Sequence, residues 1–167
     1  MEKHKKTRYQ TLSKLISGRP QAIAILTGSE KYPDIHGNLR FYTASRGVIV
    51  IYEITGLPSG HEDCDNPIFA IHIHDGSECS GNATDPFANA GVHYNPHRCP
   101  HPYHAGDMPP LFGCDGYAFS AFLTNRFDIS EIIGKAVVIH SAPDDFTSQP
   151  AGNSGEKIAC GRIFGAK

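Results

Sequence analysis

The segment Ile68–Gly76 reads IFAIHIHDG, and it is the most informative stretch for the fold. Side chains alternate between the two faces of a β-strand, so Ile71 and Ile73 point to one face and His72 and His74 to the other. Such a strand can pack its isoleucines into a core and present two imidazoles together on the opposite face. Taken alone, a His-x-His pair is more often an ordinary pair of exposed or core histidines than a metal site.

Short apolar or alternating segments bounded by turn residues lie on both sides of this strand. The chain of 167 residues contains 17 glycines and 12 prolines, which indicates many turns. This pattern predicts an all-β domain, with no more than one helical turn near residues 129–133. The expected strands are 21–27, 39–43, 47–55, 68–74, 116–124, 135–140 and 157–164.

Two long segments, 75–115 and 141–156, carry little strand pattern. Structureless loops of this length in a compact domain are usually either functional or disordered, and the histidines of these segments favour a function. The first contains HYNPHRCPHPYHAGD, with four histidines and one aspartate within 15 residues. Neutral imidazoles bind Zn²⁺ or Cu²⁺, and one carboxylate completes a tetrahedral zinc site. The residues concerned are His93, His97, His101, His104 and Asp107.

The second long segment follows a further candidate ligand. His140 ends the predicted strand KAVVIH, so it can bring a third imidazole to His72 and His74. Asp144 and Asp145 come next, and their carboxylates could orient ligand imidazoles through the second ring nitrogen.

The charge is unevenly distributed along the chain. Residues 1–20 carry six basic residues against one acidic residue, whereas the remainder carries nine against sixteen. We expect 1–20 to be a flexible basic arm and 21–167 to be the folded domain. The formal net charge of −2 gives no reason to expect a nucleic-acid or membrane partner. No signal peptide is recognisable, so a cytoplasmic location is the default, and an extracytoplasmic one is the alternative.

Several motifs together resemble the copper/zinc superoxide dismutases of bacterial type. They are IHIHDG, GVHYNP, HAGDMPPL, GKAVVIHSAPDDF, SGNSG and ACGRI, and their order matches that of the family across residues 21–164. The resemblance implies an eight-stranded Greek-key β-barrel, an immunoglobulin-like sandwich with long metal-binding and electrostatic loops. It also implies an oxidoreductase that converts superoxide to O₂ and H₂O₂, with one copper and one zinc per chain.

The resemblance also assigns residues to roles, position by position. Asp144 matches an aspartate that links a copper-ligand histidine to a zinc-ligand histidine, and Cys79 and Cys160 match a disulfide pair. His93 matches the histidine that bridges both metals and carries a proton. The implied ligands are His72, His74, His93 and His140 for copper, and His93, His101, His104 and Asp107 for zinc.

Besides the missing signal peptide that bacterial members commonly have, the chain departs from the family pattern in three respects. His93 and His104 are only eleven positions apart, which leaves His97 as an alternative to His101. Lys157 stands where the family has an arginine, and we expect it to attract the anionic substrate. Three further cysteines, Cys64, Cys99 and Cys114, have no counterpart in the pattern.

Two other functions compete with the enzyme. A non-enzymatic zinc- or copper-binding β-barrel would need the ligands but no open copper position. A purely structural β-barrel would leave the histidines unexplained. A homodimer is compatible with the resemblance, although no sequence feature requires it.

Overall fold

Strands dominate the part of the chain that this computed structural model describes, residues 16–59 and 67–166. Between the strands lie two short helical elements of about one turn each, α2 (Ile129–Ile132) and η1 (Ala88–Ala90). The strands are β1 (Ala22–Gly28), β2 (His36–Ala44), β3 (Gly47–Thr55), β4 (Ile68–Phe69), β5 (Ile71–His74), β6 (Leu111–Phe112), β7 (Ala118–Thr124), β8 (Ala136–His140) and β9 (Lys157–Gly165).

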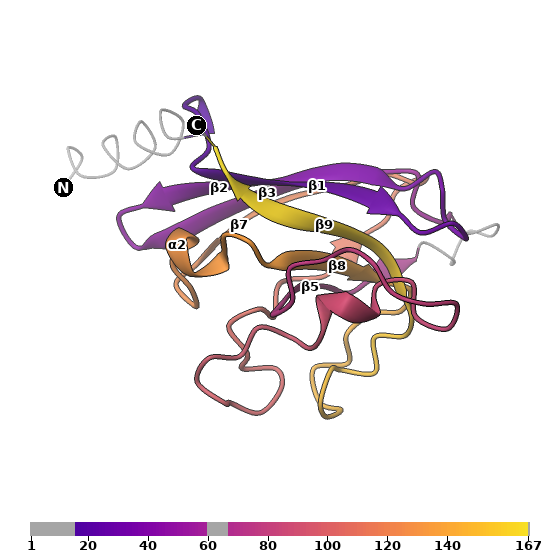
Figure 1. Cartoon of the computed structure of the whole chain (residues 1–167). Coiled ribbons are helices and arrows are strands. Elements are labelled where there is room, and N and C mark those ends of the chain that lie inside the picture. Colours follow the sequence, from indigo (N-terminus) through magenta and orange to yellow (C-terminus); the bar gives the residue numbers. More distant parts are fainter. Residues whose placement is uncertain (1–15, 60–66, 167) are drawn as a thin grey trace.

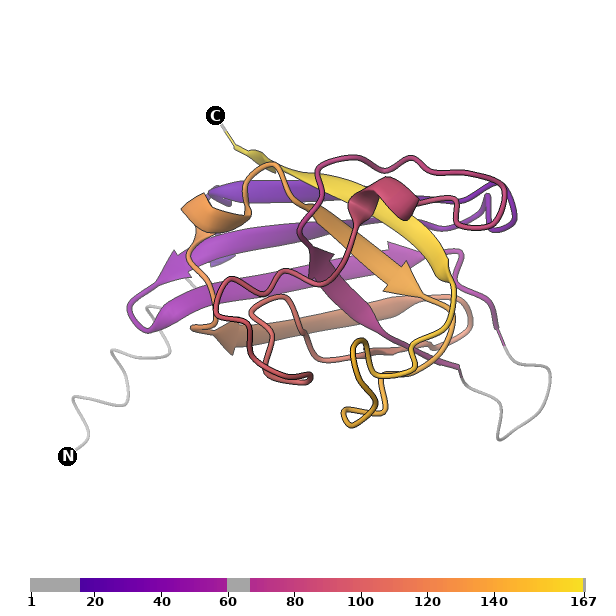
Figure 2. The same ribbon diagram turned by 60° about the horizontal axis from the view of Figure 1, so that its bottom comes forward.

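Seven of these strands form one curled antiparallel sheet in the order β5-β8-β9-β1-β2-β3-β7. The chain crosses from β3 to β5 and from β7 to β8, so it connects opposite ends of this order, as in a Greek key. The short pair β4–β6 lies beside the sheet, and β6 contacts β7. Figures 1 and 2 show that the long connections before β6 and between β8 and β9 gather on one side of the barrel. The predicted all-β barrel fold is confirmed.

Apart from shifts of one to three residues at strand ends, the strands differ from the predicted ranges in two ways. Strand 68–74 is divided at Ala70, whose N–H donates to the carbonyl of Ala142 while its own carbonyl accepts from the N–H of His140. Leu111 and Phe112, which no pattern predicted, pair with Phe69 and Ile68. With β4 and β5 counted as one interrupted strand, the structure has the expected eight strand positions.

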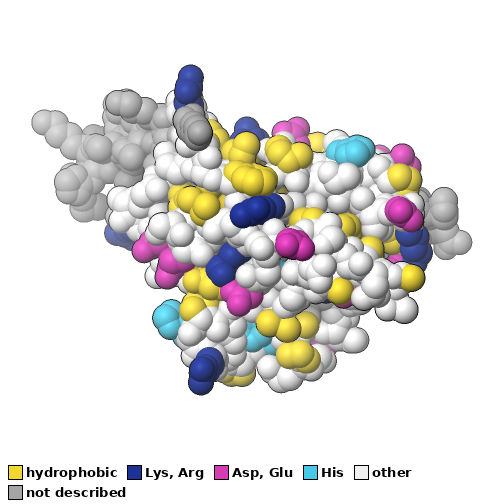
Figure 3. Space-filling view, in the orientation of Figure 1, with side chains coloured by type: hydrophobic (Ala, Val, Ile, Leu, Met, Phe, Trp, Pro, Cys, Tyr) yellow, Lys and Arg dark blue, Asp and Glu magenta, His cyan; other side chains and the backbone are white. Residues whose placement is uncertain are grey.

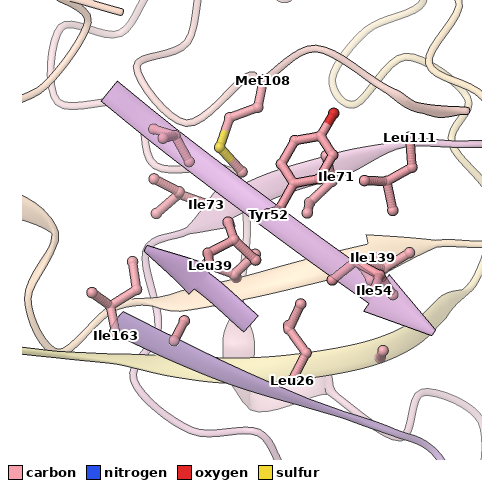
Figure 4. Packing of buried hydrophobic residues seen from close by; sticks show 14 of the residues in the cluster. Leu26, Leu39, Tyr52, Ile54, Ile71, Ile73, Met108, Leu111, Ile139 and Ile163 are labelled. Carbon is pink, nitrogen blue, oxygen red and sulfur yellow. The ribbon is translucent and has the colours of Figure 1, made fainter. Parts of the chain in front are cut away.

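The core lies between the inner faces of the curled sheet. Alternate residues of β3 point inward, among them Val50, Tyr52 and Ile54, and Figure 4 shows Tyr52 and Ile54 beside side chains from other strands. Ile71 and Ile73 of β5 are fully buried in the same cluster. The inward position of these two isoleucines places the histidines of β5 on the opposite face.

The metal-loop segment 91–107 covers the open edge of β5. Ile73 donates its N–H to the carbonyl of Gly106 and accepts from the N–H of Tyr94. An added Cβ at Gly106 would lie 2.2 Å from the carbonyl oxygen of Ile73, so only glycine fits at this close approach. Backbone hydrogen bonds therefore hold the loop against the strand that carries His72 and His74.

Two predictions concern residues that lie partly or wholly outside the described part of the chain. Residues 1–15 of the expected basic arm, and Cys64, lie outside the described residues. Among the helices of the described part, none is long and apolar enough to cross a membrane.

Candidate metal centre

Four histidines from three parts of the fold converge beside the sheet. His72 and His74 come from β5, His140 ends β8, and His93 comes from the metal-loop segment. One ring nitrogen from each lies within 4.8 Å of the others. All four side chains are buried, and the rings of His72 and His93 lie with their centroids 3.9 Å apart.

In His74 and His140, a hydrogen bond to a backbone carbonyl determines which ring nitrogen points toward the other histidines. Nδ1 of His74 donates to the carbonyl of Gly91 at 2.8 Å, and Nδ1 of His140 donates to that of Gly155 at 3.4 Å. The two Nε2 atoms then lie 3.2 Å apart. In the neutral rings each Nε2 carries a lone pair, so the two lone pairs face one another. A cation between them would turn this repulsive contact into a favourable one.

A second group shares His93 and adds three loop residues. Ligand atoms of His93, His101, His104 and Asp107 lie within 4.8 Å of one another. The carboxylate of Asp107 lies 3.2 Å from Nδ1 of His101 and 3.4 Å from Nδ1 of His104. A tight turn makes this possible, because the N–H of His104 also donates to Oδ2 of Asp107 at 3.0 Å. The four donors form the N₃O set that zinc prefers.

Asp144 connects the two groups. Its carboxylate oxygens accept hydrogen bonds from Nε2 of His72 and Nε2 of His101, each at 2.8 Å. Gly152 leaves room for it, since an added Cβ there would lie 2.0 Å from Oδ1 of Asp144. Asp145 contacts neither ring; its carboxylate instead accepts hydrogen bonds from Ser148 and the neighbouring turn.

Burial and hydrogen bonding set the protonation of these groups. Burial lowers the pKa of His140 to about 3, and it also lowers the pKa of His72, His74 and His104. Burial alone would raise the pKa of Asp144, but hydrogen bonds from His72, the Phe146 N–H and His101 outweigh it and hold that pKa at about 2. At neutral pH these four rings are therefore neutral and Asp144 is charged, which suits metal binding.

A disulfide attaches the beginning of the first long segment to the barrel. Cys79 is joined to Cys160 of β9, with their Cα atoms 5.5 Å apart, as the resemblance implied. Cys99 and Cys114 are free thiols.

The two candidate loop histidines lie in different surroundings. His101 is 3% exposed and belongs to the second group, whereas His97 is exposed and belongs to neither. The hydrogen bonds of His101 explain its position: its N–H donates to the side chain of Gln149, and Gln149 donates back to its carbonyl at 2.7 Å.

Several contributors to the site could not be recognised from the sequence. The carbonyls of Gly91 and Gly155 belong to the backbone and leave no signal in residue type. Arg126 lies after β7, and its guanidinium donates to the carbonyls of Pro102 and His104 at 2.9 and 3.2 Å. It thereby ties the loop that carries His104 to the barrel, although nothing in its sequence neighbourhood suggests this role.

A pocket of about 570 Å³ opens onto the first group. His74, His93 and His140 line it, whereas His72 is fully buried and does not. Lys157 also lines the pocket, but its ammonium is bonded to Asp85 at 2.6 Å. A small anion can therefore reach three of the four histidines from outside.

The unpartnered atoms of the site test whether metals fit it. Buried polar atoms are nearly always hydrogen-bonded. Among the described residues, the buried side-chain atoms without a hydrogen bond include Nδ1 of His72, Nε2 of His93 and Nδ1 of His101, each in one of the two groups. Metal ions would supply the missing partners. A Greek-key barrel with two four-ligand groups that share one imidazole defines a dinuclear metal protein.

Comparison of the sequence with known proteins identifies the family within this class of dinuclear metal proteins. The profile of the copper/zinc superoxide dismutase family matches residues 35–163, and the chain belongs to this family. A copper/zinc superoxide dismutase of Aquifex aeolicus is 33% identical over 145 residues, which cover 78% of this chain and 80% of the relative. One from Deinococcus radiodurans is 32% identical, and the match covers 76% of this chain and 76% of the relative. One from Mesembryanthemum crystallinum is 31% identical, and the match covers 86% of this chain and 94% of the relative.

Proposed function

We propose that the chain is a superoxide dismutase that converts two superoxide anions and two protons into O₂ and H₂O₂. The observation that supports this most directly is the shared ring of His93. The ring belongs to both ligand groups, its Nδ1 lies beside Asp107, its buried Nε2 has no hydrogen-bond partner, and a pocket reaches it from solvent.

The free ring nitrogens support a particular assignment of ligands. For copper we propose Nδ1 of His72 together with Nε2 of His74, His93 and His140. For zinc we propose Nδ1 of His93, His101 and His104 together with the carboxylate of Asp107. In the rings of His72, His74, His101 and His140, the remaining nitrogen lies at a carboxylate or a carbonyl, an arrangement that orients metal-bound imidazoles.

The residues around the pocket would carry out the rest of the chemistry. Copper, when bound, supplies the reversible one-electron step, and zinc supplies none because it has no accessible redox state. His93 is suited to hold a proton at Nε2, because that atom is buried without a partner while Nδ1 lies 2.8 Å from Asp107. The proton can then pass to the reduced dioxygen species in the pocket, and a second proton comes from water.

A non-enzymatic metal-binding module is the alternative. It would need the same histidines but no approach to them from solvent. The pocket against His74, His93 and His140 favours the enzyme.

Pulse measurement of superoxide decay separates the two functions. The chain should be purified without added metal, analysed for copper and zinc, then reconstituted and assayed. We expect one copper and one zinc per chain. We also expect a superoxide decay rate far above that given by the same metals bound to serum albumin. Full occupancy of both metals with no acceleration would establish the binding module instead.

We also propose a homodimer and an oxidising compartment. Phe119 and Leu123 of the terminal strand β7 are 58% and 54% exposed, which suits contact with a second copy.

The Cys79–Cys160 disulfide persists more readily outside the cytoplasm, so it favours the extracytoplasmic alternative over the default expected from the sequence. Sedimentation analysis and cell fractionation test these two proposals.

A further inference from the structure

Lys157 does not present a free positive charge to the pocket. Its Nζ lies 2.6 Å from Oδ2 of Asp85 and 3.2 Å from the carbonyl oxygen of Phe87. The lysine side chain is only 15% exposed and that of Asp85 is 38% exposed. An approaching anion therefore meets a compensated ion pair rather than an isolated ammonium.

Asp85 is held in place by its own loop. Its Oδ1 accepts the N–H of Phe87 at 3.0 Å, and its backbone N–H donates to the side chain of Asn82 at 3.1 Å. The same loop is joined to β9 by the disulfide of Cys160, three residues after Lys157. A covalent link and an ion pair thus attach one loop to neighbouring positions of one strand.

The other charges near the pocket do not replace the compensated ammonium. The charged residues that line it are Asp85, Glu156 and Lys157, so two carboxylates stand against one ammonium. The partner of Glu156 is Lys31, at 2.6 Å, which does not line this pocket. Figure 3 shows acidic and basic side chains interspersed over one face of the molecule, with no broad region of a single sign there.

We propose that Asp85 determines how strongly the metal pocket attracts anions, because its carboxylate compensates Lys157 and holds the ammonium against the loop. This inference deepens the proposed function and rests on it for the identity of the anion. In the wild-type chain, Lys157 then serves mainly to hold the loop of Asp85 against β9. It attracts anions only when Asp85 loses its charge.

The test uses Asp85→Asn in the copper- and zinc-loaded chain, with azide as the probe anion. Asparagine keeps the size of aspartate and can still accept the N–H of Phe87. We expect azide to bind the copper site about threefold to tenfold more tightly at low salt, the effect of one uncovered charge in a partly solvated pocket. The superoxide decay rate should rise by a similar factor, and both gains should shrink as ionic strength increases.

Two control variants separate release of Lys157 from a simple change in net charge. Glu156→Gln removes one carboxylate from the same pocket without touching Lys157, and should change azide affinity by less than twofold. Asp85→Asn combined with Lys157→Gln should return azide affinity to the wild-type value. If Asp85→Asn fails to fold, Asp85→Ser replaces it, since its hydroxyl can still accept from the loop backbone.

Unchanged azide affinity in the folded Asp85 variant would overturn the inference, and so would an equal gain in Glu156→Gln. Azide binding is read from the copper absorption spectrum and requires no turnover. A chain that shows the azide effect but no acceleration of superoxide decay would therefore refute the proposed function and leave the role of Asp85 intact.

Discussion

Oδ1 of Asp107 lies 2.8 Å from Nδ1 of His93, and both side chains are only 4% exposed. The contact turns Nδ1 of the ring toward the group with His101 and His104. Nε2 of the same ring is buried without a hydrogen-bond partner, and the ring also belongs to the group with His72, His74 and His140. One imidazole thus lies between two groups of donors, and the predicted effects of changing it follow from that position.

His93→Ala should affect both metals at once. We expect loss of activity, a changed copper absorption spectrum and a lower melting temperature, because each group loses one of four ligands. Metal analysis, spectroscopy and calorimetry measure these effects. His97→Ala is the matched control from the same loop, since His97 is exposed and belongs to neither group. Near-normal activity of a fully metallated His93→Ala chain would rule out the bridged site.

Asp144→Asn should weaken metal binding without removing any ligand. The carboxylate accepts from His72 and His101, and its loss leaves both rings poorly oriented. Zinc affinity should fall about tenfold to a hundredfold, as for other groups that orient metal-bound imidazoles. Competition with a chelator measures it. Asp145→Asn provides the neighbouring control, because this carboxylate bonds only to its own turn, and equal losses in both variants would contradict the assignment.

Removal of the disulfide should destabilise the fold and loosen the loop that carries Asp85. The bond joins residues 81 positions apart, and closing a loop of this size stabilises a chain by roughly 4 kcal/mol in entropy models. Cys79→Ser should therefore lower the melting temperature and speed zinc loss to a chelator. Cys114→Ser, at an exposed free thiol, should change neither quantity. Denaturant unfolding that gives the same free energy for both variants would refute this prediction.

The metal-free chain should become less stable as the pH falls below about 6.5. The folded-state pKa of His140 is about 3, against 6.5 ordinarily, so the unfolded chain binds more protons between these values. The free energy of unfolding then decreases as the pH is lowered, by up to about 1.4 kcal/mol per pH unit for this group. Asp144, with a pKa of about 2 against 3.8, extends the loss to lower pH.

Melting temperatures of the metal-free chain between pH 7 and pH 4 test this dependence. His140→Gln should make the decline shallower, since the variant has no imidazole to protonate at this position. An unchanged melting temperature across the range would show that His140 titrates normally in the folded chain.

The sequence was enough to predict the strands and most of the candidate ligands, because both depend on local spacing. Alternation in IHIH places two imidazoles on one face wherever that strand lies, and seven of the eight strand positions follow from apolar or alternating segments between turns, whereas β6 left no such pattern. The tertiary structure places His101, and not His97, in the second group, because that position depends on contacts with Asp107, Asp144 and Gln149 that form only on folding. It also brings Lys157, the predicted anion guide, against the carboxylate of Asp85. Seventy-two positions separate these residues, and no local pattern can encode a contact that exists only when a loop meets β9.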